Sequence, residues 1–215
     1  PKIEAFSHVR KNVHHYPQLI NNGSVVKYRS KIKLDGTNCA IRTFINNETN
    51  EIDLAIQTRE RFATPENDNY GSAKWFLEKK DEWVKNHERL LGRNRNELIL
   101  HGEFAGSGVQ SRTSVSKING KIFAIFAAQI RVFKTLTQDE IYMDNFITDP
   151  KALLGLMPKD FNTKLGTYVL PWFDENILTV DFSVSAEMLQ EQMNQFNSVI
   201  QKIDEEDPWV KETFN

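Results

Sequence analysis

The sequence predicts an α+β protein built on an antiparallel sheet. Apolar and polar residues alternate in short segments that are separated by hairpin-length polar turns, as is typical of antiparallel strands. Two longer segments instead repeat apolar residues every three or four positions, as amphipathic helices do. Strands joined by short turns and interrupted by a few long helices favour this class over a parallel sheet.

The first three strands are expected at residues 25–31, 38–46 and 52–57, as an antiparallel meander. The polar run Asn46–Asn50 supplies the second turn. The first turn has the sequence KLDGTN, from Lys33 to Asn38, and it places Lys33 at a strand edge beside a carboxylate and a glycine.

A helix is expected over residues 71–91, and Gly92 provides its C-terminal stop. Buried strands at 97–104 and 121–132 follow, and the Gly- and Ser-rich loop between them, at 106–120, lies where a substrate could approach. Residues 133–215 are expected to be helical and irregular. They include a second helix that has Ser185 as its N-cap and ends at Pro208.

The composition is that of an ordinary globular protein. With 215 residues, 40% of them hydrophobic, the chain can bury a sizeable core, and one domain over residues 1–215 is expected. No segment approaches the roughly 18 apolar residues of a membrane span, and no signal peptide is recognisable, so an intracellular location, cytoplasmic or nuclear, is predicted. The single cysteine, Cys39, excludes an intrachain disulfide. The sequence leaves the oligomeric state open.

The net charge of −2 means that any nucleic acid must bind a local basic surface. Each basic cluster is also consistent with an ordinary solvated face. The candidate clusters are Lys79 with Lys80, then Arg89 with Arg93 and Arg95, and finally Arg112 with Lys117.

Lys33 is a candidate covalent nucleophile. A lysine amine attacks phosphorus only when it is unprotonated, so its pKa must be brought down from about 10.4 by desolvation or by a neighbouring cation. Lys31, two residues away on the same strand face, is expected to be that cation. The alternative is that Lys33 is a solvated surface residue, as most lysines are.

The pattern Lys-x-Asp-Gly-x-Asn, from Lys33 to Asn38, resembles motif I of the covalent nucleotidyltransferases, which comprise ATP-dependent RNA ligases, DNA ligases and mRNA capping enzymes. Asn38 stands where DNA ligases and capping enzymes usually carry arginine, which favours the RNA ligases. Three further segments follow in the family's order. They are TRER at 58–61, HGEFAG at 101–106 and KIFAIFAA at 121–128, which resemble motifs Ia, III and IIIa.

The resemblance implies a role for each motif. Lys33 would be the catalytic residue that accepts AMP, and Arg59 would meet the nucleotide or the 5′-phosphate end, because an arginine fork holds two phosphate oxygens at once. Glu103 would serve the ribose or, through water, a Mg²⁺ ion. Phe126 would stack on the adenine, with Phe123 as the alternative. The further predicted ATP contacts are Lys31, Ile32, Asp35, Gly36 and Asn38, and the tentative nucleic-acid contacts are Arg61, Arg89, Arg93 and Arg95.

The chain departs from the family after about residue 130. Motif IV, a Glu-Gly-x-Val strand, and motif V, a Lys-x-Lys strand that holds the α-phosphate, are not found before Asn215, although 204–215 resembles the approach to motif IV. The resemblance therefore implies a nucleotidyltransferase fold that is incomplete at its C-terminus, with its motifs at about 25–130. Either the chain is a piece of a longer ligase, or it is a divergent protein without the second half of the pocket. The missing lysines would weaken catalysis by these residues alone.

The function implied is that of an ATP-dependent RNA ligase, with ATP and Mg²⁺ as cofactors and RNA ends bearing a 5′-phosphate and a 3′-OH as partners. Two alternatives stay open. One is a DNA ligase or capping guanylyltransferase, which nucleotide preference and nicked substrates would separate. The other is a non-catalytic nucleotide- or RNA-binding module, which ATP would stabilise without forming a covalent adduct.

Overall fold

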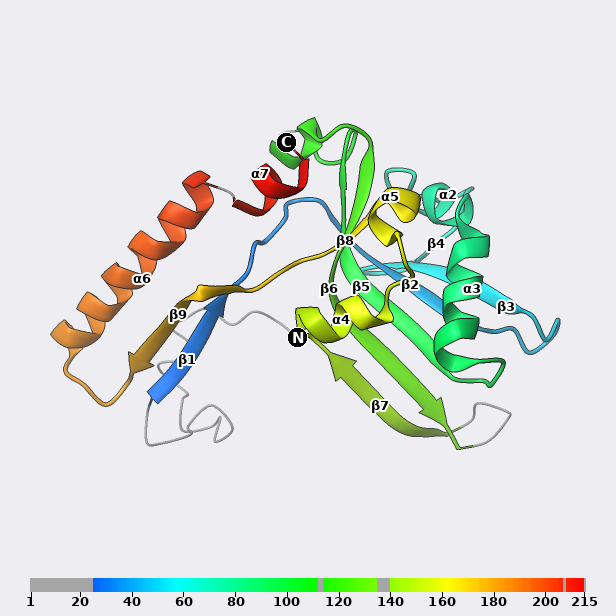
Figure 1. Cartoon of the computed structure of the whole chain (residues 1–215), viewed down its shortest axis with the longest axis horizontal. Helices are drawn as coiled ribbons and strands as arrows, with labels where there is room; N and C mark the ends of the chain where they lie inside the picture. The colour runs from blue at the N-terminus through cyan, green and yellow to red at the C-terminus, as the bar shows by residue number, and fades with distance from the viewer. Residues whose placement is uncertain (1–24, 112–113, 135–139, 207, 215) are drawn as a thin grey trace. The chain divides into compact units, whose positions relative to one another are not determined.

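The computed structural model describes residues 25–111, 114–134, 140–206 and 208–214 (Figure 1). Its contacts divide the chain into two compact units, one spanning Lys33–Leu170 and the other formed by the chain before and after it. Both units contain strands and helices, and the strand pairs are antiparallel except for one, so the predicted α+β class is confirmed. None of the helices among the described residues is long and apolar enough to cross a membrane.

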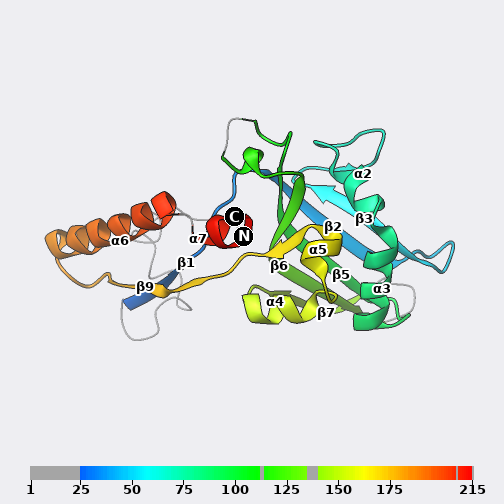
Figure 2. The ribbon, with the colours of Figure 1, turned by 45° about the horizontal axis from the view of Figure 1, so that its top comes forward.

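The larger unit is a seven-stranded sheet with the order β4-β3-β2-β5-β6-β7, and β8 pairs with β6 beside this path (Figure 2). Its strands are β2 (Thr37–Ile45), β3 (Ile52–Thr58), β4 (Phe62–Ala63), β5 (Glu97–Gly106), β6 (Lys121–Phe133), β7 (Ile141–Ile147) and β8 (Thr167–Val169). Its helices are α2 (Ser72–Leu77), α3 (Lys80–Leu91), α4 (Pro150–Leu156) and α5 (Phe161–Leu165), with a 3-10 turn η3 (Ser114–Lys117).

The helices of this unit pack on one face of the sheet. Apolar residues at alternate positions of β2, β3, β5 and β6 share a core with Phe76 of α2, Trp83 of α3, Leu153 of α4 and Leu165 of α5. The opposite face carries the intervening positions, among them Asn38, Glu103 and Gln129. The helix layer therefore leaves Asn38 and Glu103 on the other side of the sheet.

The smaller unit pairs β1 (Val25–Ser30) with β9 (Phe173–Asp181) and adds the helices α6 (Ala186–Glu206) and α7 (Pro208–Phe214). The helix α6 packs against β9, and Gln192 of α6 accepts a hydrogen bond from the backbone N–H of Asp181 at 2.9 Å. The ring of Phe196 lies 6.4 Å from that of Tyr28 on β1.

The prediction of a three-strand meander that starts at residue 25 is wrong. Both edges of β2 are occupied, by β3 on one side and by β5 on the other, so β1 has no edge there and pairs with β9. The segment from Lys33 to Gly36 is consequently not the turn of a hairpin. It is the first segment of the larger unit, directly after the boundary at Ile32.

The predicted helix over 71–91 is two helices. The backbone N–H of Lys79 bonds to the carbonyl of Phe76 at 3.1 Å, a tight turn that separates α2 from α3. The ammonium of Lys79 donates to the carbonyl of Trp75 at 3.2 Å and lies over the indole ring. The break lets both Phe76 and Trp83 reach the core. Gly92 follows α3 with φ 65°, as the predicted stop requires.

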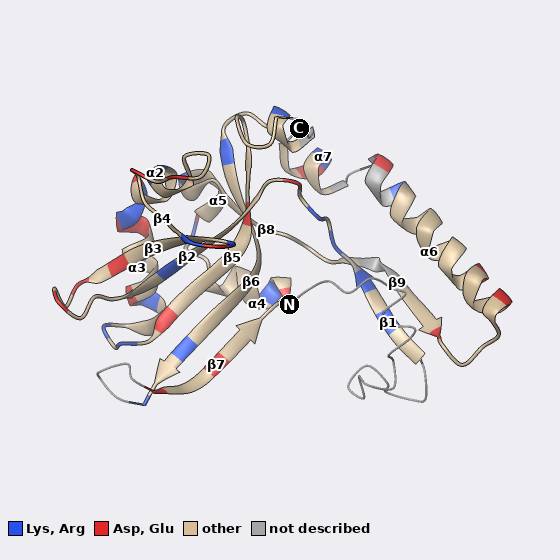
Figure 3. Ribbon diagram, turned by 180° about the vertical axis from the view of Figure 1, so that it is seen from behind, with Lys and Arg blue, Asp and Glu red and all other residues tan. Residues whose placement is uncertain are grey.

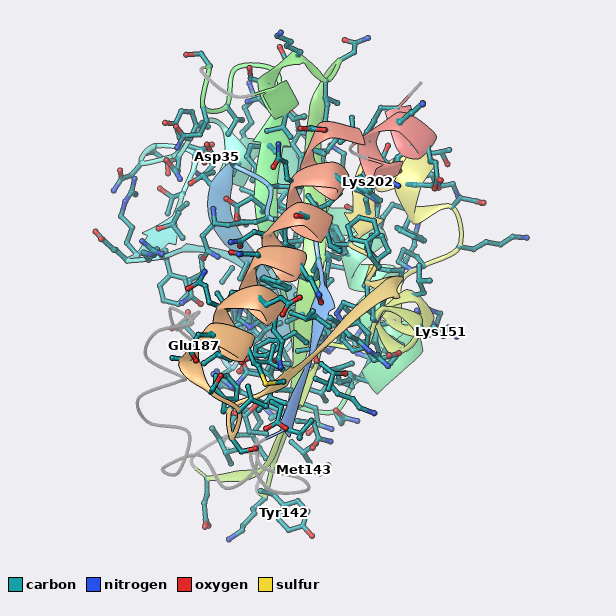
Figure 4. All side chains as sticks on the ribbon, turned by 90° about the vertical axis from the view of Figure 1, so that its left-hand side faces the viewer. Asp35, Tyr142, Met143, Lys151, Glu187 and Lys202 are labelled. Atoms are coloured by element: carbon teal, nitrogen blue, oxygen red, sulfur yellow. The ribbon has the colours of Figure 1, made fainter. Side chains whose placement is uncertain are left out.

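Residues 133–215 contain more regular structure than the sequence indicates, because β7, β8 and β9 lie there together with four helices. Ser185 does cap α6, since its hydroxyl accepts a hydrogen bond from the N–H of Met188 at 3.3 Å. Pro208 begins α7 directly after α6. The edge strand β7 is exposed, and Tyr142 and Met143 extend from it into solvent (Figure 4).

Candidate active site

The beginning of β2 is held against β5 by a close backbone approach at Gly36. The N–H of Gly36 donates to Oε1 of Glu103 at 3.2 Å, and a Cβ atom at this position would lie 2.3 Å from the carbonyl oxygen of Phe104. No side chain fits such a space. The glycine of the Lys-x-Asp-Gly pattern is therefore required by contact with the neighbouring strand, without a left-handed backbone conformation.

Glu103 is the centre of a charged cluster. It pairs with Asn38 across the β2–β5 ladder, and its carboxylate interacts electrostatically with Lys33, Asp35 and Arg59. Burial raises the pKa of this carboxyl group, while the Gly36 N–H and the charges of Lys33 and Arg59 oppose the rise. Lys33 and Asp35 themselves are exposed, and Figure 4 labels Asp35 at the surface.

Arg59 reaches this cluster because β3 ends beside the start of β2. Cys39 pairs with Thr58, the last residue of β3, and a tight turn follows in which the Thr58 N–H donates to the carbonyl of Arg61 at 2.8 Å. Arg59 lies in this turn and is exposed. The structure thus brings Lys33, Asp35, Arg59 and Glu103 into one cluster, although 70 positions separate the first of them from the last.

Phe126 lies at a β-bulge. Ile125 pairs with Gly102 and Ala127 with His101, so Phe126 is an extra residue on β6. It is half-buried, whereas Phe123 is fully buried and packs edge-on against Phe76. Of the two predicted stacking residues, only Phe126 retains exposed surface, and Phe123 belongs to the core.

Lys31 and Ile32 are half-buried and belong to the smaller unit. Burial lowers the pKa of Lys31. Their predicted roles beside Lys33, as a cation and as a nucleotide contact, stay predictions.

Most of the arginines predicted to contact nucleic acid have partners within the protein. Arg89 donates to the carbonyls of Leu156 and Met157 at 3.2 and 3.1 Å, which ties α3 to the end of α4. Arg93 pairs with Glu51 at 3.1 Å. The remaining basic candidates also bond within the protein. Arg61 donates to the carbonyls of Asn67 and Asp68, and Arg95 donates to the side chain of Asn47. Lys79 donates to the carbonyl of Trp75, and Lys80 pairs with the carboxylate of Asp53.

These contacts give each of those residues a structural role, and contact with nucleic acid stays a prediction for them. Arg112 lies outside the described residues, and its predicted partner Lys117 is exposed at the end of η3. Cys39 is buried in β2, which raises the pKa of its thiol to about 12, so it packs as a small apolar residue of the strand.

Sequence reasoning missed a polar network on the same sheet face. Glu97, only 1% exposed, accepts from Arg42 and faces Arg131, and Arg131 also faces Asp144 at 3.7 Å. Figure 3 shows this alternation of acidic and basic positions across β5, β6 and β7. A glutamate at the start of an apolar strand is the signal that could have indicated the network, because a buried carboxylate requires partners.

The network continues toward the bulge. His101 bonds through Nε2 to Oε1 of Gln129 at 3.3 Å, and Nε2 of Gln129 donates to both carboxylate oxygens of Asp144, at 2.7 and 2.8 Å. Burial lowers the pKa of His101, which favours the neutral imidazole. These residues fix the strands on either side of Phe126.

A family model for RNA ligase matches residues 28–200, which is most of the chain and includes all four sequence motifs. The chain belongs to the RNA ligase family. Its family motifs coincide with the charged cluster around Glu103 and with the bulge at Phe126. Comparison with curated protein sequences found no relative.

Among solved structures, the fold is similar to that of three variants of the Naegleria gruberi RNA ligase, each determined with ATP and manganese. The TM-scores are 0.43, 0.47 and 0.42, with sequence identities of 16%, 16% and 18%. The similarity covers 80% of this chain and 42% of each of those chains. The chain therefore spans less than half the length of these ligases.

Proposed function

We propose that this chain is the adenylyltransferase part of an ATP-dependent RNA ligase that works through a covalent lysyl-AMP. The observation that carries the proposal is the cluster in which the Glu103 carboxylate binds the Gly36 N–H of the Lys33–Asn38 motif and interacts electrostatically with Lys33 and Arg59, in a chain of the RNA ligase family. A nucleophilic amine, a phosphate-binding guanidinium and a carboxylate are the groups that nucleotidyl transfer to lysine requires.

In the first step the Nζ atom of Lys33 attacks the α-phosphorus of ATP. A nitrogen–phosphorus bond forms, the bond from the α-phosphorus to the bridging oxygen breaks, pyrophosphate leaves, and the amine loses its proton. Arg59 holds phosphate oxygens with its fork, and Phe126 offers its partly exposed ring to the adenine. Of the remaining predicted contacts, Asp35, Gly36 and Asn38 belong to the same unit as Lys33 and complete the nucleotide site there.

AMP is then transferred to the 5′-phosphate of an RNA strand, and a 3′-OH displaces it to join the ends. Covalent catalysis of this kind divides one difficult displacement into easier ones. The charge of Arg59, at the exposed turn after β3, suits an incoming phosphorylated end.

The acidic residues near Lys33 fit a hydrated Mg²⁺ ion. The described residues contain no group of three or more His, Cys, Asp or Glu side chains that could hold a metal ion. Glu103 and Asp35 do supply carboxylate oxygens in the cluster, and Mg²⁺ is commonly held by one or two carboxylates, substrate phosphates and several waters. When bound, the metal offsets negative charge on the phosphates.

Incubation with α-labelled ATP and Mg²⁺ tests the proposal. We expect the protein to acquire covalent label, and we expect Lys33→Ala to abolish the label because it removes the attacking amine. Lys74→Ala is the matched control, since Lys74 is an exposed lysine of the same unit, on α2.

Retention of the label by Lys33→Ala would disprove the assigned nucleophile. Stabilisation of the protein by ATP without any adduct would instead indicate a non-catalytic binding module. If the label forms, sealing of nicked RNA in preference to nicked DNA is the expected substrate choice.

A further inference from the structure

The segment between β4 and α2, residues 64–71, is fixed in place by contacts on both sides of Asn69. The Arg61 guanidinium donates to the carbonyls of Asn67 and Asp68, at 2.5 and 3.4 Å. On the other side, the Lys121 ammonium donates to the carbonyl of Tyr70 at 2.5 Å. The residues that flank Asn69 are therefore anchored to the turn before β4 and to β6.

Asp68 adds a second anchor at the start of α2. Its carboxylate accepts from the N–H groups of Ala73 and Lys74 at 2.8 and 3.1 Å, and from the Ser72 hydroxyl at 3.3 Å. These contacts satisfy donors that the first turn of a helix leaves open. The hydrogen bonds described so far hold the segment and the start of α2 in place, and none of them involves the Asn69 side chain.

The Asn69 side chain instead reaches the first residue of β2. Its Nδ2 donates to the Thr37 hydroxyl at 2.8 Å, across 32 positions of sequence. Two consecutive left-handed residues, Tyr70 with φ 55° and Gly71 with φ 77°, follow Asn69 and reverse the chain there. A non-glycine residue with positive φ is uncommon, so the surrounding contacts impose this geometry.

Thr37 occupies the position between Gly36 and Asn38, in the Lys33–Asn38 motif. The residues from Lys33 to Gly36 belong to no helix or strand. Within this segment, the side chain of Leu34 is buried, at 4% exposed. Thr37 is paired with Phe104 of β5, and side chains bind the end of this segment at two adjacent positions, Glu103 at Gly36 and Asn69 at Thr37. The two bonds approach from different elements, β5 and the segment before α2.

We infer that Asn69 is a positioning residue for nucleotidyl transfer. It holds Thr37, and through it the Lys33–Gly36 segment, in the geometry from which Lys33 reaches the α-phosphate. The inference rests on the proposed function for its catalytic consequence. Asn69 carries no charge and donates its amide proton within the protein, so it acts through Thr37 and not on the substrate.

The first test measures lysyl-AMP formation in the full chain with Asn69→Ala and Thr37→Val, the latter removing the hydroxyl at nearly constant volume. We expect each variant to slow adduct formation at saturating ATP by about fivefold or more, with little change in the ATP concentration for half-maximal rate. The melting temperature should stay near that of the wild type. Asn69→Ala should have no further effect when Thr37 is already valine, because the two side chains act as one unit.

Asn67→Ala is the matched control. Asn67 is exposed in the same segment and takes part in the hydrogen bonds described above through its backbone, so its truncation should leave the rate unchanged. Wild-type kinetics in Asn69→Ala would overturn the inference. So would additive effects of Asn69→Ala and Thr37→Val, or a loss of rate that only parallels a loss of melting temperature.

A second measurement separates this inference from the proposed function. Amide hydrogen exchange over residues 34–38 should accelerate in Asn69→Ala and Thr37→Val but not in Asn67→Ala, because the end of the segment loses one of the two side-chain bonds that support its pairing with β5. Unchanged exchange would overturn the positioning role even in an active protein. Absence of any lysyl-AMP in the wild type would count against the proposed function, and the exchange would still decide whether Asn69 holds the segment.

Discussion

Glu103 combines two conflicting environments in one side chain. Burial disfavours its ionised form, while Lys33, Arg59 and the Gly36 N–H favour that form, and the balance leaves its pKa raised. The burial of this carboxyl group is costly, and the positive groups around it offset part of that cost. Residues that lower stability in this way are typical of functional sites.

Replacement of Glu103 by glutamine should separate function from stability. Because the folded-state pKa is raised above the unfolded value, the stability that the neutral Glu103 contributes is present at low pH and is lost as pH rises through the folded pKa. As pH rises through this window, the free energy of unfolding of Glu103→Gln should therefore increase relative to that of the wild type. Adduct formation should fall by about tenfold or more, as a charged contact is lost.

Urea unfolding between pH 4 and 8 and the labelling assay measure the two effects. Glu66→Gln, at an exposed position of the same unit, provides the control and should alter neither. A stability difference between Glu103→Gln and wild type that is constant with pH would contradict the assigned cause of the pKa shift.

At the scale of elements, α3 is joined to β2 by a buried histidine. His87 is fully buried, and its Nδ1 lies 2.8 Å from the Thr43 hydroxyl, which itself donates to the carbonyl of Leu98 at 3.5 Å. Thr43 must then accept from an Nδ1–H, so the imidazole is the neutral tautomer protonated at Nδ1. Burial lowers the pKa of His87, in agreement with a neutral ring.

This contact predicts a pH dependence of stability. The folded-state pKa of His87 lies below its unfolded value of about 6.5, so its contribution is complete above that pH and is lost as pH falls through the folded pKa. Thr43→Val should lower the free energy of unfolding by about 1–3 kcal/mol, since it leaves a buried N–H without an acceptor. Urea unfolding at pH 8 and pH 5 measures both.

Thr179→Val, at an exposed position on β9, is the control for loss of a hydroxyl and should cost little. His87→Gln should flatten the dependence of stability on pH below 6.5. An unchanged slope in that variant would show that other groups are responsible.

At the scale of the whole molecule, a net charge of −2 must be reconciled with the RNA partner that we propose. The attraction has to come from a few cations that are not neutralised within the protein. Arg93 faces Glu51 and Glu88 at 3.1 and 3.9 Å, whereas Arg59 lies exposed at the turn beside the candidate site. These two arginines are therefore expected to differ in their contribution to RNA binding.

The affinity for a nicked RNA duplex with a 5′-phosphate should fall as salt is raised from about 50 to 200 mM. Arg59→Ala should reduce the slope of log K against log salt by about 1, as the loss of one phosphate contact does, and Arg93→Ala should leave it unchanged. Fluorescence anisotropy titrations provide the slopes. Equal slopes for wild type and Arg59→Ala would show that Arg59 does not contact the RNA.

The sequence by itself determined the class of fold, some of the strands and the identity of the motifs, because each depends on local patterns. Alternation predicted β2, β3, β5 and β6 closely, and the hexapeptide from Lys33 to Asn38 indicated the family. Charge and aromatic type were enough to nominate Glu103 and Phe126. These are properties of residues a few positions apart.

Only the tertiary structure decided which of these residues meet. The pairing of β1 with β9, the bulge that separates Phe126 from the core, and the bond from Asn69 to Thr37 all join distant segments. Periodicity carries no information on such pairing, since it depends on which strand edges and hydrogen-bonding groups are still open once the nearer elements have packed. The lysine that the sequence singles out therefore depends for its position on an asparagine that the sequence does not distinguish.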